Sequence, residues 1–160
     1  MLSPGKRWTA IILTGLMASC VDDKQHVSLV KDGVVYAVPT AHLISHTVTP
    51  HQFIRIKHPD RPFELAFDSR SAQRMAPNGW PVIFSLNDGT APNVDYVESA
   101  GHKVVCRRAP APVGGCGFRM IVHAGDWSVL FPPDQLANIG AIRSQAARQL
   151  ETYWRNSRSS

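Results

Sequence analysis

Short hydrophobic runs separated by turn-forming residues occur along most of the chain. The first two runs flank Lys31-Asp32-Gly33, and an Asp-Gly pair between apolar runs is the strongest short signal for a β-hairpin. Later runs alternate between apolar and polar side chains or are bounded by Gly, Asn and Pro turns. The pattern predicts antiparallel strands over residues 27–30, 34–38, 53–57, 63–67, 81–86, 94–99, 103–106, 118–123 and 127–131. The connection 39–52 contains an element of undetermined type near residues 41–45.

One segment near the C-terminus has the spacing of a long amphipathic helix. Pro132-Pro133 ends the last strand, Asp134 lies near the predicted helix N-terminus, and the helix is expected to reach about Trp154. Apolar residues spaced three and four apart form one stripe along it, which is expected to pack on the core: Leu136, Ile139, Ile142, Ala146, Leu150 and Tyr153.

Together these elements predict an α+β fold that is mostly β. We expect an antiparallel meander of about seven to nine strands with one C-terminal helix packed across one face. The composition, 44% hydrophobic and 18% charged, allows such a core and excludes a disordered chain. The domain is expected over residues 27–155, followed by a flexible tail at 156–160.

The first 19 residues have a different pattern, that of a secretory signal peptide. Lys6 and Arg7 form a short positive region, and the apolar run that follows, 8–16, has nine residues. A membrane span needs about 20 apolar residues, so this run is too short to be a stable anchor on its own. We therefore expect residues 1–19 to be removed and residues 20–26 to form a short tether.

The end of this segment, Leu16-Met17-Ala18-Ser19-Cys20, resembles the lipobox of bacterial lipoproteins, with Met17 where that family usually has leucine. The resemblance implies cleavage before Cys20 and a covalent lipid on Cys20, with no other cofactor. Two or more acyl chains give stable anchoring to a membrane. It also implies a periplasm-facing cell-envelope location, and Val21 after the cysteine favours the outer membrane over the inner one. The alternative is an ordinary signal peptide with a chance cysteine.

Loss of the signal peptide also changes the charge balance. Removing Lys6 and Arg7 lowers the 17 Lys and Arg residues to 15, against 12 Asp and Glu, so the formal charge falls from +5 to +3. No Lys/Arg block remains in the mature chain. We therefore expect no nucleic-acid partner.

The chain contains three cysteines, and lipidation of Cys20 leaves Cys106 and Cys116. Outside the cytoplasm such a pair is expected to form a disulfide, which would close a loop of about 11 residues and stabilise the fold by about 2–3 kcal/mol. A reactive thiol or a metal-binding pair is the alternative. Neither has the expected neighbours, because the loop contains no Cys-x-x-Cys motif and no histidine.

The loop between these cysteines is the candidate partner-binding surface. Pro110 and Pro112 stiffen it, and Arg107 and Arg108 supply planar donors that can bind carboxylates or phosphates in pairs. The alternative is that both arginines only solvate the tip of a hairpin.

The remaining candidates for chemistry are weak. His42 and His46 are four residues apart but lack the intervening Glu of the zinc-protease motif, so no metal site is expected. Glu64 and Asp68 share one strand face, as a catalytic carboxylate pair does, but Arg70 offers a simple ion-pair explanation. We expect no catalytic residues and no enzymatic activity.

Several stretches together resemble one group of lipoproteins. With the lipobox and the terminal helix, they are FELAFDSR (63–70), VVCRRA (104–109), GGCGF (114–118) and WSVLFPPDQL (127–136). This layout is similar to the small envelope immunity lipoproteins that neutralise type VI secretion lipase effectors. The resemblance implies a secreted toxin as protein partner and no turnover. The alternatives are a structural or assembly lipoprotein of an envelope machine, and a small envelope hydrolase that uses Glu64 or Asp68.

Overall fold

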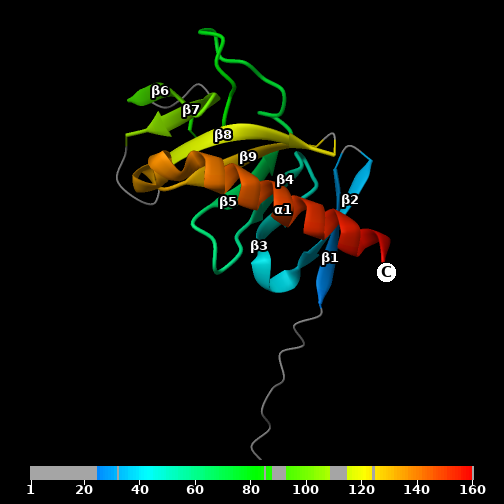
Figure 1. Cartoon of the computed structure of the whole chain (residues 1–160). Helices are drawn as coiled ribbons and strands as arrows, with labels where there is room; N and C mark the ends of the chain where they lie inside the picture. Colours follow the sequence, from blue (N-terminus) through cyan, green and yellow to red (C-terminus); the bar gives the residue numbers. More distant parts are fainter. Residues whose placement is uncertain are drawn as a thin grey trace, which may run out of the picture.

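Nine antiparallel strands and one long helix form the part of the chain that this computed structural model describes, namely residues 25–31, 33–84, 86–87, 93–108, 115–123 and 125–159 (Figure 1). The predicted α+β, mostly β class is confirmed. The predicted signal peptide, Cys20, and the loop prolines Pro110 and Pro112 lie outside the described residues.

The first two strands form a small sheet of their own. β1 (His26–Lys31) pairs with β2 (Val34–Pro39) in an antiparallel hairpin, with Leu29 opposite Tyr36. Gly33 lies in the turn at φ +77°, a conformation that glycine adopts without strain. The hairpin predicted on either side of the Asp-Gly pair is therefore confirmed, with Gly33 in its turn.

The other seven strands form one sheet in the order β3-β4-β5-β9-β8-β7-β6. These strands are β3 (Leu43–Thr47), β4 (Phe53–Ile56), β5 (Glu64–Asp68), β6 (Val94–Ser99), β7 (His102–Arg107), β8 (Gly115–Val122) and β9 (Gly125–Phe131). The sheet consists of two meanders, β3-β4-β5 and β6-β7-β8-β9, which are joined where β5 pairs with β9. The undetermined element near 41–45 is a 3₁₀ turn, η1 (Thr40–His42), followed by β3.

The C-terminal helix lies across one face of this sheet, and its last turns reach β1 and β2 (Figure 1). A 3₁₀ segment, η2 (Pro133–Asn138), precedes α1 (Ile139–Arg158). All the predicted stripe residues within α1 are buried, while Leu136 in η2 is half-buried. The predicted stripe therefore packs on the core as expected.

The predicted start of the helical region is confirmed, but its predicted end was wrong. Asp134 lies in the first turn of η2, and α1, which follows, has no side-chain cap. At the other end, α1 continues to Arg158, into the segment predicted as a flexible tail. The Ser157 hydroxyl lies 2.8 Å from the carbonyl of Val35 in β2 and 2.6 Å from that of Trp154 in its own helix, so the last turn contacts the small sheet.

The main core fills the space between the sheet, α1 and the β1–β2 hairpin. Trp127 in β9 is fully buried, and its ring packs edge-on against Tyr36 with centroids 5.4 Å apart. The Tyr36 hydroxyl donates to the carbonyl of Val122 at 3.1 Å. Phe63, Leu65 and Phe67, which alternate along the predicted strand 63–67, all belong to this core.

The opposite face of the sheet is covered by residues 69–87, which contain no helix and no strand within the described part of the segment. Arg119 of β8 holds this segment in place: its Nη2 donates to the carbonyls of Ser71, Arg74 and Val82 at 3.3, 2.7 and 3.1 Å. Its Nε lies 3.2 Å from Oδ1 of buried Asp126. The Arg119 side chain thus connects three points of the segment 69–87 to β8.

The prediction of a strand at 81–86 was wrong. The Asn87 side chain forms hydrogen bonds with backbone groups that a strand would pair with a neighbouring strand. Asn87 Oδ1 accepts from the Ile83 amide at 2.6 Å, and Asn87 Nδ2 donates to the Pro81 carbonyl at 2.9 Å. Ile83 and Leu86 still pack on the sheet, where Gly117 leaves room for them. The segment is therefore apolar like a strand but folded as a turn.

Candidate functional site

The structure joins Cys106 of β7 to Cys116 of β8 by the expected disulfide, with the Cα atoms 4.0 Å apart. The two cysteines lie directly opposite each other in the strand pair. The bridge therefore fixes β7 to β8 at the base of the loop that carries the candidate arginines.

The two candidate arginines differ in their surroundings. Arg108 donates from Nε and Nη2 to the two carboxylate oxygens of Asp95 in β6. These hydrogen bonds lower the pKa of the Asp95 carboxyl below its ordinary value of 3.8. Arg107 is half-buried in β7. Arg108 is therefore held by Asp95 of the same chain, a residue that the sequence did not indicate. Binding of a partner by Arg107 and Arg108 stays a prediction.

The two carboxylates considered for catalysis are each held by an arginine. Glu64 Oε2 lies 2.6 Å from Arg55 Nη2 of the neighbouring strand β4. Asp68 Oδ2 accepts from Arg70 Nη2 at 2.6 Å, and Asp68 Oδ1 accepts from the Arg70 amide at 2.9 Å. The Arg70 explanation therefore holds for Asp68, whereas Glu64 pairs with Arg55.

The electrostatics of Asp68 follow from this geometry. Burial raises the pKa of the Asp68 carboxyl, but the side-chain and backbone hydrogen bonds from Arg70 and its charge outweigh burial. The pKa therefore lies below its ordinary value of 3.8. A carboxyl that is this readily ionised is poorly suited to act as a general acid near neutral pH.

The histidine spacing does not produce a helical pair of ligands. His42 lies in η1 and His46 in β3. His42 Nδ1 is 2.8 Å from the hydroxyl of Tyr153 on α1, whose pKa burial raises to about 12. Among the described residues, no three His, Cys, Asp or Glu side chains are grouped so that they could hold a metal ion.

A cleft of about 430 Å³ lies beside β8. β7 pairs with β8 only through Val105–Arg107 and Gly115–Gly117. Beyond Gly117 the β6–β7 hairpin diverges from β8, and the cleft opens between them. We call this space the β8 cleft.

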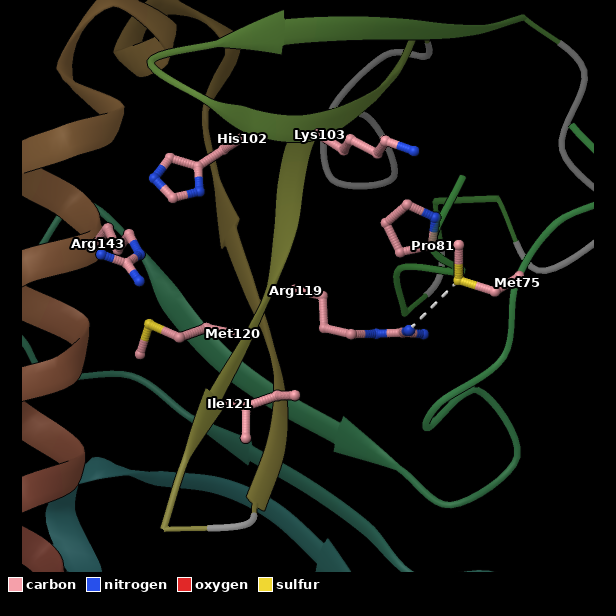
Figure 2. Close-up of a pocket in the computed structure, with 8 residues that line it drawn as sticks. All are labelled: Met75, Pro81, His102, Lys103, Arg119, Met120, Ile121 and Arg143. Atoms are coloured by element: carbon pink, nitrogen blue, oxygen red, sulfur yellow. Dashed lines mark hydrogen bonds between the residues drawn. The ribbon is translucent and has the colours of Figure 1, made fainter. Parts of the chain in front are cut away.

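Side chains from both faces of the sheet line the β8 cleft (Figure 2). On the side of α1 lie His102, Met120 and Arg143; on the other side lie Met75, Pro81, Lys103, Arg119 and Ile121. The Ile121 side chain is 71% exposed and Met75 is 55% exposed. The cleft therefore combines accessible apolar side chains with basic groups.

The charged residues that line the β8 cleft are all basic. None of its lining residues is acidic. Neither Lys103 nor Arg143 forms an ion pair with a described carboxylate, and the Lys103 ammonium donates instead to the Gly79 carbonyl at 3.3 Å. Burial, and then the charge of Arg143, lower the pKa of His102 below its ordinary value of 6.5. The cleft therefore attracts acidic groups.

Sequence reasoning missed the β8 cleft because its residues come from four separate stretches of the chain. A signal was nevertheless present, because Arg119 and Ile121 alternate with core residues in the same strand, so Ile121 lies on the face away from the helix. An isoleucine on that face indicates an additional contact.

Comparisons with protein-family models, curated proteins and solved structures found no match for this chain. Among the described helices, none is long and apolar enough to cross a membrane.

Proposed function

We propose that this chain is a lipid-anchored protein of the cell envelope whose folded domain binds a protein partner in the periplasm. The observation that carries the proposal is the β8 cleft, where exposed Ile121 and Met75 lie beside Lys103 and Arg143 with no acidic lining residue. Apolar contact area flanked by charge of one sign is typical of a surface that recognises another protein.

The specific function that we propose is immunity. The similarity of the chain to immunity lipoproteins supports a type VI secretion lipase effector as the partner, neutralised by direct occlusion without turnover. A lipid on Cys20 would hold the domain where the effector arrives. The ion pairs of Glu64 with Arg55 and of Asp68 with Arg70 also favour a binding role over acid–base catalysis.

Replacing the lipidated residue tests the anchor. Cys20→Ser should leave an uncleaved or soluble product, because the acylated thiol is lost. The measurements are fractionation of membranes and labelling with a fatty-acid analogue. Unchanged fractionation and labelling in the variant would show that the chain is not a lipoprotein.

Loss and rescue in the native host test the immunity function. Cells that lack the chain should be killed by sister cells that fire the effector, and expression of the full-length chain should restore survival. The effector should co-purify with the full-length chain. Cells that remain viable without the chain, together with no co-purified effector, would contradict the proposal.

Two exposed isoleucines provide a matched pair of variants for the same assay. Ile121→Asp places a charge in the β8 cleft, whereas Ile44→Asp places it on β3 at the far end of the same sheet, where Ile44 is 48% exposed. Only Ile121→Asp should reduce protection. Equal loss of protection in both variants would show that the cleft is not the binding surface.

A further inference from the structure

Part of β8 is an open sheet edge. Phe118–Val122 pair with β9 on one side, but on the other side no described strand pairs with them. The β8 cleft lies along this free side (Figure 2). An open edge presents backbone donors and acceptors to any extended segment that can reach them.

The direction of these backbone groups follows from the strand register. The Cα separation of 4.0 Å between Cys106 and Cys116 is typical of a pair that exchanges no backbone hydrogen bonds. The N–H and C=O of Cys116 therefore point toward β9, and those of Gly117 point toward β7. By alternation, the N–H and C=O groups of Arg119 and Ile121 point into the β8 cleft.

The opposite wall of the cleft offers backbone groups as well. Ser99 pairs with His102 across a two-residue turn in which Ala100 and Gly101 have φ of +49° and +75°. The two residues that flank such a turn form backbone hydrogen bonds with each other. The N–H and C=O of His102 therefore point toward β6. The N–H and C=O of Lys103, the next residue, therefore point across the cleft toward β8.

The side chains around this edge form two walls of different chemistry. On the α1 side, Arg143 supplies positive charge, and on the other side Ile121 and Met75 supply apolar surface beside the positive charge of Lys103. A strand added to β8 directs alternate side chains to these two walls. The matching ligand is an extended acidic segment that also carries apolar side chains for Ile121 and Met75.

We propose that an extended acidic segment of the partner protein binds this chain by adding a strand to the free edge of β8. The mode of recognition rests on the proposed function, because it describes how the partner would be held. The free edge of about five residues, near 17 Å long, matches a short extended segment. Backbone hydrogen bonds supply affinity and the two walls supply specificity.

The first experiment tests the edge in the free protein. Hydrogen exchange of the full-length chain in detergent micelles is measured residue by residue with NMR. The amides of Arg119 and Ile121 should exchange fast, whereas those of Phe118 and Met120, which face β9, should be protected. Equal protection of all four amides would show that the edge is already paired and would overturn the proposal.

The second experiment uses a defined probe: an acetylated, fluorescein-labelled peptide of alternating glutamate and valine. The probe should bind the full-length chain and slow exchange at Arg119 and Ile121. The same peptide with lysine in place of glutamate should not bind, and N-methylation of alternate backbone amides should abolish binding. Equal binding of the lysine peptide, or no binding of the probe at millimolar concentration, would overturn the proposal.

Variants locate the bound probe. Arg143→Glu and Ile121→Asp should each weaken the affinity about tenfold or more, because they repel the acidic side chains. Ile44→Asp on β3 is the matched control and should leave the affinity unchanged. Two outcomes would place the probe elsewhere and overturn the proposal: weaker binding in Ile44→Asp alone, or unchanged binding in both Arg143→Glu and Ile121→Asp.

The results separate this inference from the proposed function. If the probe protects Arg119 and Ile121 but the chain gives no protection against the effector, strand addition holds and the immunity function fails. If the chain neutralises the effector while effector binding leaves exchange at these two amides unchanged, the immunity function holds and strand addition fails.

Discussion

The two faces of the seven-stranded sheet are covered in different ways. The face under α1 is apolar, and its buried residues, among them Trp127 and Phe118, form one core with Leu150 and other residues of α1. The opposite face carries Arg119, Asp126 and other polar side chains beneath the segment 69–87. A face covered by a helix depends on many similar contacts, whereas a face covered by a turn-rich segment depends on a few side chains with several hydrogen bonds each.

The largest expected effect compares one residue from each face. Arg119→Met should destabilise the fold by about 3–5 kcal/mol, because Asp126 loses its buried ion-pair partner. Leu150→Ala, in the helix that covers the apolar face, should destabilise the fold by a similar amount, about 2–5 kcal/mol, through loss of packing. Unfolding in denaturant measures both variants.

The control for this comparison is Arg148→Met on the exposed side of α1, which should change stability by less than about 0.5 kcal/mol. If Arg119→Met is as mild as this control, the segment 69–87 does not depend on the Arg119 side chain.

The next effect concerns the disulfide, which holds the β6–β7 hairpin to β8. The double variant Cys106→Ala, Cys116→Ala should lose about 2–3 kcal/mol. Because β7 joins β8 through only three residue pairs, the amides of β6 and β7 should exchange faster while those of α1 keep their relative protection. Uniformly faster exchange throughout the domain would contradict this local role.

A smaller effect tests the packing of the polar face. A Cβ at Gly117 would lie 2.8 Å from Ile83 Cγ2, so Gly117→Ala should destabilise the fold by about 1–3 kcal/mol. In the same strand, a Cβ at Gly115 meets its nearest atom at 3.4 Å, so Gly115→Ala is the matched control. Thermal unfolding of both variants measures the difference, and equal stability of the two would show that Ile83 does not pack closely on β8.

The smallest expected effect is the pH dependence contributed by Asp68. Its pKa in the folded chain is lowered below 3.8, so ionised Asp68 stabilises the fold above that pH, and the stabilisation is lost as the pH falls further. Asp68→Asn should therefore lower Tm at pH 7, and its difference from the unchanged chain should shrink below pH 3.8. Exposed Asp134→Asn is the control and should not alter Tm at either pH. A difference for Asp68→Asn that stays constant across this range would contradict the ion-pair argument.

The same contrast between the faces explains what the sequence could predict. The stripe through Ile142 and Leu150 and the turn at Gly33 are local signals, because spacing and backbone conformation are set by adjacent residues. The partners of Arg119 are carbonyls more than 35 residues away along the chain. No local pattern indicates such a contact, and the same kind of contact by Asn87 made an apolar turn resemble a strand.

The candidate site divides in a similar way. Cys106 and Cys116 were paired correctly, because so few cysteines leave little choice of partner. The β8 cleft depends on where the β6–β7 hairpin leaves the sheet, which follows from strand order. The contact of Asp95 with Arg108 could not be predicted for the same reason, because it depends on β6 pairing with β7.

The contact between Ser157 and Val35 has a consequence for the height of the β8 cleft above a membrane. It brings the end of α1 to the hairpin where the chain enters the fold, six residues after Cys20. Arg143, at the cleft, lies 15 residues from Arg158 along the helix, a span of about 22 Å. In the proposed anchored state the length of the helix would hold the β8 cleft away from the lipid surface, where a protein in the periplasm can reach it.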